Sequence, residues 1–205
     1  MTKPVEVLRL GPVQVPPCGP IDAPIYLVGE APSTEEEKQL TPFVGQAGRT
    51  LRRATAEWID KARIGNVLPY RTFTYNPQGR EVNRTPTVTE IEYFGGLLMD
   101  DILEVNPKVI VLLGATATEW AEIRGIIPRS TAPLRDKRAR NPYEYRIKHH
   151  IIASKPESGT TFECKVLVTY HPQYINYQGQ RGDLKTYEEF CADLNRAWSI
   201  ANETP

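Results

Sequence analysis

Cysteine is scarce in this chain of 205 residues, which contains only 3, Cys18, Cys164 and Cys191. They are widely separated, odd in number and include no CxxC pair, which argues against a disulfide framework and against a zinc site. An iron–sulfur cluster normally takes four thiolates, and three cysteines cannot supply them. We therefore expect no metal site and no cofactor, and we assign the cysteines to packing.

A long apolar run is also missing, so no segment is predicted to span a bilayer. Residues 1–4 lack the apolar core of a signal peptide, and we expect an intracellular protein, in the cytoplasm or at the nucleoid. Net charge is absent as well, because 25 Lys and Arg balance 25 Asp and Glu. Binding to a polyanion must therefore depend on where the cations are placed and not on their total.

Neither a P-loop nor a GxGxxG turn follows a predicted strand, which disfavours a generic nucleotide-binding protein. The chain does have four apolar runs typical of buried strands, at residues 25–28, 64–68, 109–113 and 165–169. Helical patterns separate these runs. The alternation predicts an α/β fold, a three-layer α/β/α sandwich around a central, mostly parallel four-stranded sheet. With 40% hydrophobic residues, the chain suits a single domain over residues 1–205.

Local signals describe the segments between the strands. Residues 1–24 are rich in proline and are predicted to form an irregular arm on the domain. Ser33 is a candidate N-cap, and Thr87 with Glu90 makes a capping box at the start of a long helix. Residues 69–86 are predicted as a long polar loop. Its arginines and aromatic residues suit contacts with a nucleic-acid strand, and they equally suit an ordinary surface loop.

A basic stretch at residues 124–150 is hidden by the balanced total charge. Clustered cations release counterions from a nucleic-acid backbone and give salt-dependent affinity, whereas a solvated loop is the alternative. We predict a basic insertion over residues 128–164, with a hairpin made by residues 143–148 and 151–154. The candidate DNA-binding residues, which include two arginines of the polar loop, are Arg71, Arg84, Arg135, Lys137, Arg138 and Arg140.

Two motifs lie close together near the first strand. Gly29-Glu30-Ala31-Pro32 is followed by Pro42-Phe43-Val44-Gly45 and Ala47-Gly48, and a His171-Pro172 pair ends the last strand. These motifs and their spacing resemble the uracil-DNA glycosylase superfamily, most closely its family 4, the thermophile-type branch that usually carries an iron–sulfur cluster. Residues 107–118 are also similar to that family, and the likeness extends over residues 25–198.

The chain departs from the family at several positions. Tyr70 precedes Arg71 where the family has a cluster cysteine, in agreement with the shortage of thiolates. Ser33 replaces a glycine, and Gln173 replaces a serine or alanine. Residues 146–163 form a longer insertion than is usual near the expected substrate side.

The resemblance implies cleavage of the bond between deoxyribose and a pyrimidine that has been flipped out of the DNA stack. His171 would donate a hydrogen bond to the pyrimidine O2, and Glu30, or a backbone group of its turn, would position the attacking water. Phe43 would stack on the base, and Asn66 would read its Watson–Crick edge. The expected substrate-binding residues are completed by Gly29, Ala31, Pro32 and Pro172.

The leading hypothesis is a monofunctional DNA glycosylase that acts as a monomer on single- or double-stranded DNA, removes uracil and leaves an abasic site. A glycosylase for a modified pyrimidine, such as a hypermodified base in viral DNA, is an alternative motivated by the insertion, Ser33 and Gln173. A non-catalytic protein that recognises uracil-containing DNA or another protein is a second alternative.

Overall fold

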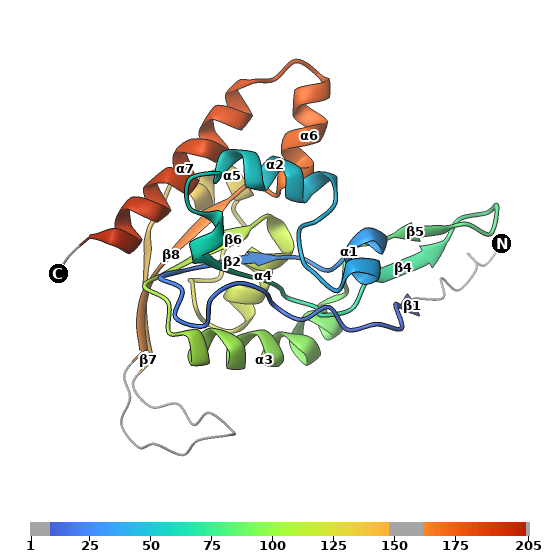
Figure 1. Ribbon diagram of the computed structural model, residues 1–205, viewed down its shortest axis with the longest axis horizontal. Helices are drawn as coiled ribbons and strands as arrows, with labels where there is room; N and C mark the ends of the chain where they lie inside the picture. The colour runs from blue at the N-terminus through green and yellow to red at the C-terminus, as the bar shows by residue number, and fades with distance from the viewer. Residues whose placement is uncertain (1–8, 148–161, 204–205) are drawn as a thin grey trace.

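The computed structural model describes residues 9–147 and 162–203, and its main element is a five-stranded sheet (Figure 1). The strand order is β3-β2-β6-β8-β7. Four strands run parallel, β2 (Ile25–Gly29), β3 (Ala62–Asn66), β6 (Val109–Leu113) and β8 (Phe162–Thr169), and β7 (Tyr143–Ile147) is antiparallel to β8. The mostly parallel sheet is confirmed, but the predicted number of four strands is wrong.

The fifth strand, β7, comes from the segment predicted as a local hairpin. Its residues pair with the first half of β8, so that Tyr143 lies opposite Val166 and Ile147 opposite Phe162. Tyr143 and Tyr145 pack against the core beside the sheet, and this burial favours pairing with β8. The other predicted hairpin strand, residues 151–154, lies outside the described residues.

Helices cover both faces of the sheet, as the three-layer prediction requires (Figure 1). Because side chains alternate along a strand, β2 feeds two cores. Tyr26 and Val28 join the core beneath the helices α3 (Val88–Val105) and α4 (Ala115–Ile123). Ile25 and Leu27 face the other core, formed with α2 (Gln46–Ala54), α6 (Pro172–Gln180) and α7 (Lys185–Asn202). Shorter helices are α1 (Thr34–Gln39), α5 (Leu134–Arg138) and the 3-10 turn η1 (Ile59–Lys61).

A second, three-stranded sheet contains part of the segment predicted as a loop. It has the order β1 (Arg9–Leu10), β4 (Thr72–Tyr75) and β5 (Glu81–Asn83). The Asn76 side chain accepts hydrogen bonds from the backbone N–H groups of Gln78 and Arg80, and Gly79 has a φ of 73°. This turn chemistry closes the β4–β5 hairpin, so the prediction of a long loop over residues 69–86 is wrong.

The proline-rich arm lies along the domain where the structure describes it. Gly11 donates a backbone hydrogen bond to Arg71, Val15 donates to Pro69, and Cys18 exchanges bonds with Ile64. The predicted caps are also present, because Ser33 and Thr87 each form a full capping box. None of the helices within residues 9–147 and 162–203 is long and apolar enough to cross a membrane.

Candidate functional site

A cavity of about 900 Å³ lies beside the carboxyl ends of the parallel strands. The chain passes from β2 to β3 on one side and then to β6 on the other, and such a reversal of strand order leaves a crevice at the strand ends. Residues from β2, β3, β6 and β8 or just after them line the cavity, together with α5 and the second sheet. The residues that line the cavity include Glu30, Ala31, Pro32, Ser33, Glu36, Phe43, Asn66, Thr72, Asn83, Arg84, Gly114, Pro133, Leu134, Arg135, Tyr170, His171, Gln173 and Tyr174.

Glu30 directly follows β2 and is half-buried in the cavity wall. Thr116, from the first turn of α4, donates a hydrogen bond of 2.5 Å to its Oε2 atom. Burial raises the pKa of the Glu30 carboxyl group above its ordinary value, and the Thr116 bond opposes part of that rise. A carboxyl group with a raised pKa is suited to accept a proton near neutral pH.

His171 caps the amino terminus of α6, at the end of β8. Its Nδ1 atom accepts a hydrogen bond of 3.2 Å from the backbone N–H of Gln173. Burial lowers the pKa of His171 to about 4, so the ring is neutral at pH 7. Since Nδ1 is an acceptor, the ring proton lies on Nε2, which remains a donor.

Phe43 reaches the cavity through a strained backbone. It has a φ of 56°, a left-handed conformation that is uncommon for a bulky residue. The buried carboxylate of Glu36 accepts hydrogen bonds from the backbone N–H groups of Phe43, Gly45 and Ser33, and so holds this loop. The Phe43 and His171 ring centroids are 6.3 Å apart.

Asn66 ends β3 next to Gly29 of β2. Its Nδ2 atom is buried and has no hydrogen-bond partner among the described residues. A Cβ atom at Gly29 would lie 2.3 Å from the Asn66 Oδ1 atom and 2.6 Å from the Phe43 ring. Because Gly29 has no side chain, the Asn66 amide and the Phe43 ring can both lie beside it. The unpartnered Nδ2 atom of Asn66 is available to form a hydrogen bond with a ligand.

The structure brings the predicted catalytic and substrate-binding residues to one place. Glu30, Phe43, Asn66 and His171 line the cavity with Ala31 and Pro32. Gly29 lies against the side chains of Asn66 and Phe43, and Pro172 is buried in the first turn of α6.

Four of the six predicted DNA-binding cations already have carboxylate partners. Arg71 pairs with Glu37 and Glu81, and Arg84 with Glu90. Lys137 pairs with Glu122, and Arg138 with Glu189 and Asp193. All four side chains are at most 16% exposed, so their charges are largely taken up by carboxylates of the protein itself. Arg135, at the cavity, and Arg140 are exposed.

Sequence reasoning missed several residues of the site. Gly114 and Thr116 directly follow β6, whose carboxyl end lies at the same sheet edge as the other motifs. Their place after a predicted strand is the sequence signal that could have identified them as site residues. A Cβ atom at Gly114 would lie 2.7 Å from the His171 Cβ atom. Glu36, in the first turn of α1, is a further residue that the sequence analysis did not single out; it is buried and holds the Phe43 loop.

The described residues do not fit an iron–sulfur cluster. Cys164 lies in the core on the α3 side of the sheet, whereas Cys18 packs against the opposite core and Cys191 lies on α7. Tyr70, which stands where the family has a cluster cysteine, packs its ring 5.5 Å from that of Phe94. Over the part of the chain that the structure describes, no group of three metal-ligating side chains is found.

Comparison with known proteins gives a consistent result. A family model described as the uracil DNA glycosylase superfamily matches residues 16–198. A type-4 uracil-DNA glycosylase of Archaeoglobus fulgidus is 37% identical over 185 residues, which cover 86% of this chain and 81% of that protein. A type-4 uracil-DNA glycosylase of Thermotoga maritima is 40% identical over 102 residues, which cover half of each chain. A type-4 uracil-DNA glycosylase of Pyrobaculum aerophilum is 28% identical over a stretch that covers 78% of this chain and 72% of that protein.

Proposed function

Because the chain belongs to the uracil-DNA glycosylase superfamily, we propose that it is a monofunctional DNA glycosylase that removes uracil from DNA and leaves an abasic site. The observation that carries this proposal is the cavity that holds a neutral histidine donor, a carboxyl group and a buried amide at one sheet edge. We also infer that a monomer suffices, since one chain supplies all the groups assigned below.

The target bond joins C1′ of deoxyribose to N1 of the base, and no side chain reaches it inside a duplex. The base must therefore be flipped into the cavity, where Phe43 stacks on it. Asn66 then donates from Nδ2 to O4 of uracil and accepts from N3–H through Oδ1. Cytosine has a donor at position 4 and an acceptor at N3, so the same amide orientation is mismatched.

Bond cleavage leaves the electron pair of the C1′–N1 bond on the base, which departs as an anion, while the sugar becomes positively charged. His171 Nε2–H donates to O2 of the base, where the negative charge develops. A neutral imidazole serves this role throughout the range above pH 4, because burial lowers the pKa of His171 to about 4.

Water completes the reaction by bonding to C1′. Since Thr116 occupies the Oε2 atom of Glu30, we assign the Oε1 atom to the water, whose proton the carboxylate takes. A glycosylase that also cuts the DNA strand uses an amine to form a Schiff base with the sugar. Among the described residues that line the cavity there is no lysine, which supports simple hydrolysis.

The exposed cations Arg135 and Arg140 are the proposed phosphate contacts. Arg135 lies at the cavity with its side chain 78% exposed, and its contact with Asp136 at 3.4 Å leaves most of its guanidinium in solvent. Two cations suit a modest, salt-dependent affinity.

The test is incubation of the purified protein with a single-stranded oligonucleotide that carries one uracil, beside the same oligonucleotide with cytosine. After alkali, a sizing gel should show a cut at the uracil position alone, and without alkali the strand should remain intact. A cut without alkali would contradict monofunctional hydrolysis. Binding without any cut would favour the non-catalytic alternative.

A second candidate is a glycosylase for a modified pyrimidine. The cavity volume of about 900 Å³ is near the upper end for small-ligand sites and leaves space beside a uracil ring. Ser33 gives less support than its sequence position suggested, because its side chain caps α1. A mass-spectrometric survey of bases released from varied DNAs separates the two candidates, since uracil as the sole product would exclude the second.

A further inference from the structure

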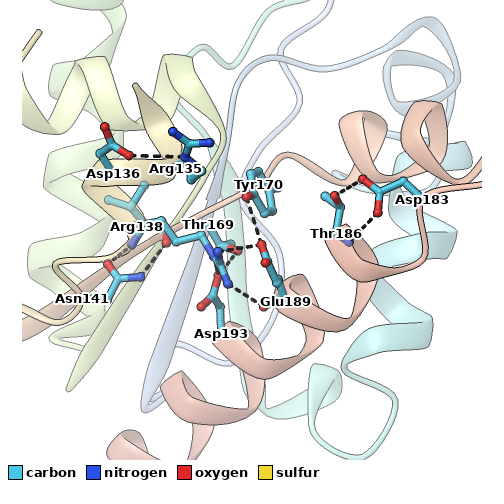
Figure 2. A network of polar contacts seen from close by, with 11 residues as sticks. Arg135, Asp136, Arg138, Asn141, Thr169, Tyr170, Asp183, Thr186, Glu189 and Asp193 are labelled. Carbon is cyan, nitrogen blue, oxygen red and sulfur yellow. Dashed lines mark hydrogen bonds and ion pairs between the residues drawn. The ribbon is translucent and has the colours of Figure 1, made fainter. Parts of the chain in front are cut away.

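A charged network holds the end of β8, immediately before His171 (Figure 2). Arg138 extends from α5 toward α7 and donates to the carboxylates of Asp193 and Glu189, with a distance of 2.8 Å to Glu189 Oε2. It also donates to the Glu189 backbone carbonyl at 3.3 Å. The planar guanidinium thus satisfies two acids one helical turn apart on α7.

Tyr170 is the residue that this network fixes most directly. The guanidinium of Arg138 lies 5.0 Å from the centre of the Tyr170 ring, and the Tyr170 hydroxyl donates to Glu189 Oε2 at 3.1 Å. On α6, the ring of Tyr174 lies 5.5 Å away. Tyr170 therefore has little rotational freedom, and it forms part of the cavity wall next to His171.

The end of β8 is also bonded to α7 and to the segment that follows α5. Thr169 donates to Asp193 at 2.7 Å, and Asn141 both donates to and accepts from the Val168 backbone, at 2.7 and 2.8 Å (Figure 2). Pro133, Leu134 and Arg135 line the cavity just before Arg138. Arg138, in the same short helix as Leu134 and Arg135, therefore connects two walls of the cavity, α5 and the end of β8.

We propose that Arg138 is a positioning residue of the glycosylase reaction, which holds Tyr170, and through it His171, against the flipped base. This proposal rests on the proposed function. Arg138 is 16% exposed between two carboxylates, so it contacts the DNA backbone only by leaving both. A phosphate contact and a positioning role therefore predict different kinetics.

The experiment compares wild type with Arg138→Met, which keeps an apolar stem close in length to the aliphatic part of arginine and removes the charged guanidinium group. Single-turnover rates at saturating enzyme are measured on a uracil oligonucleotide. Dissociation constants are measured at several salt concentrations on an analogue with 2′-fluoro-deoxyuridine, whose fluorine opposes cleavage. We expect the rate to fall at least tenfold, while the dissociation constant changes less than twofold and its salt dependence stays unchanged. Arg138→Lys should recover part of the rate, since its ammonium group reaches one of the two acids.

The matched control is Arg53→Met. Arg53 also lies over a tyrosine of α7, 4.7 Å from the Tyr187 ring centre, but it is not among the residues that line the cavity. It should leave both the rate and the dissociation constant at wild-type values. Circular dichroism and thermal unfolding verify that each variant is folded at the assay temperature. If Arg138→Met is unfolded there, Tyr170→Phe, which removes only the hydroxyl bond to Glu189, should show the same loss of rate without loss of affinity.

The proposal would be overturned if folded Arg138→Met released uracil at the wild-type rate. If Arg138→Met is unfolded, wild-type rates in both Arg138→Lys and Tyr170→Phe would overturn it. Weaker binding with a salt slope reduced by about 0.7 would instead identify Arg138 as a phosphate contact. Wild-type protein that releases no uracil would refute the proposed function itself, which separates that failure from a failure of the Arg138 proposal alone.

Discussion

The backbone N–H of Gln173 determines which nitrogen of His171 can donate a hydrogen bond. Because Nδ1 accepts that N–H at 3.2 Å, Nε2 carries the proton and is the atom available to a leaving base. Thr116 acts in a similar way on Glu30, since it occupies one carboxylate oxygen and leaves the other. Single hydrogen bonds from neighbouring residues thus assign the atoms that take part in the reaction.

The raised pKa of Glu30 predicts how activity depends on pH. Glu30 must be ionised to accept a proton, so kcat/KM should fall as the pH is lowered through a pKa above the ordinary value of 4.5. His171 cannot cause that fall, because its pKa lies at about 4. Glu30→Gln should be slower at every pH and should lose this acid limb. A pH–rate profile in which Glu30→Gln keeps the wild-type limb would contradict the assignment of Glu30 as the base.

The meeting of the motif residues at one sheet edge could be predicted from the sequence, whereas the ion pairs of the cations could not. Glu30, Phe43, Asn66 and His171 belong to motifs at strand ends, and strand ends of a parallel sheet meet at one edge. Arg138 pairs with acids 51 and 55 positions away in the chain. Such partners depend on how α5 packs on α7, which charge patterning along the sequence cannot show.

The loop between α1 and α2 shows how one buried acid shapes an element. Glu36 accepts three backbone N–H groups, and it fixes Phe43 in a conformation with positive φ that costs backbone energy. Glu36→Gln would direct an N–H₂ group at these donors and leave part of them unsatisfied. We expect a loss of about 1–3 kcal/mol in unfolding free energy and a lower single-turnover rate, because Phe43 is no longer held.

The control for this loop is Glu35→Gln, one residue earlier on α1. The Glu35 side chain is 50% exposed, and its substitution should change stability by less than about 0.5 kcal/mol. Thermal unfolding and the uracil-release rate measure both variants. Equal behaviour of the two variants would show that Glu36 does not support the Phe43 loop.

Long elements were predicted well and short strands poorly, for a physical reason. The helix α3 has a capping box, an apolar face and a left-handed C-cap at Asn106, and its predicted start at Thr87 is confirmed. The strands β4 and β5 have only 4 and 3 residues, and their stability comes from pairing with each other and with β1. Such short segments carry too little alternation to be separated from a polar loop.

The charge of the chain is balanced in sequence, and most of the predicted DNA-binding cations are also paired in space. Among the six predicted DNA-binding cations, four are neutralised by acids, and the two exposed ones lie in or just after α5. The molecule therefore suits a binding mode in which the fit of the flipped nucleotide contributes more than counterion release. This view predicts a weaker salt dependence than that of a strongly basic DNA-binding protein.

The stability of the whole fold should depend on pH through His171. The pKa of its ring is about 4 in the folded protein and about 6.5 when unfolded, so the unfolded chain binds the proton more readily. The stabilisation is present above pH 6.5 and is lost as the pH falls toward 4, by up to about 3 kcal/mol. Urea unfolding between pH 7.5 and 4.5 measures this loss.

His171→Asn is the matched variant for that measurement. An asparagine is a good N-cap and can still accept from the Gln173 backbone, but it does not titrate. The unfolding free energy of His171→Asn should fall less steeply than that of wild type as the pH is lowered from 7.5 to 4.5. Identical slopes for the two proteins would show that His171 is not held neutral by the fold.

The most direct test of the account is the single-turnover rate of uracil release from a single-stranded oligonucleotide, for wild type and His171→Ala. We predict that wild type releases one uracil per strand and that His171→Ala is slower by about 10²–10³, because a donor to the developing anion is lost. Affinity for the 2′-fluoro analogue should be nearly the same for both proteins. Equal rates for the two proteins, or no uracil released by wild type, would contradict it.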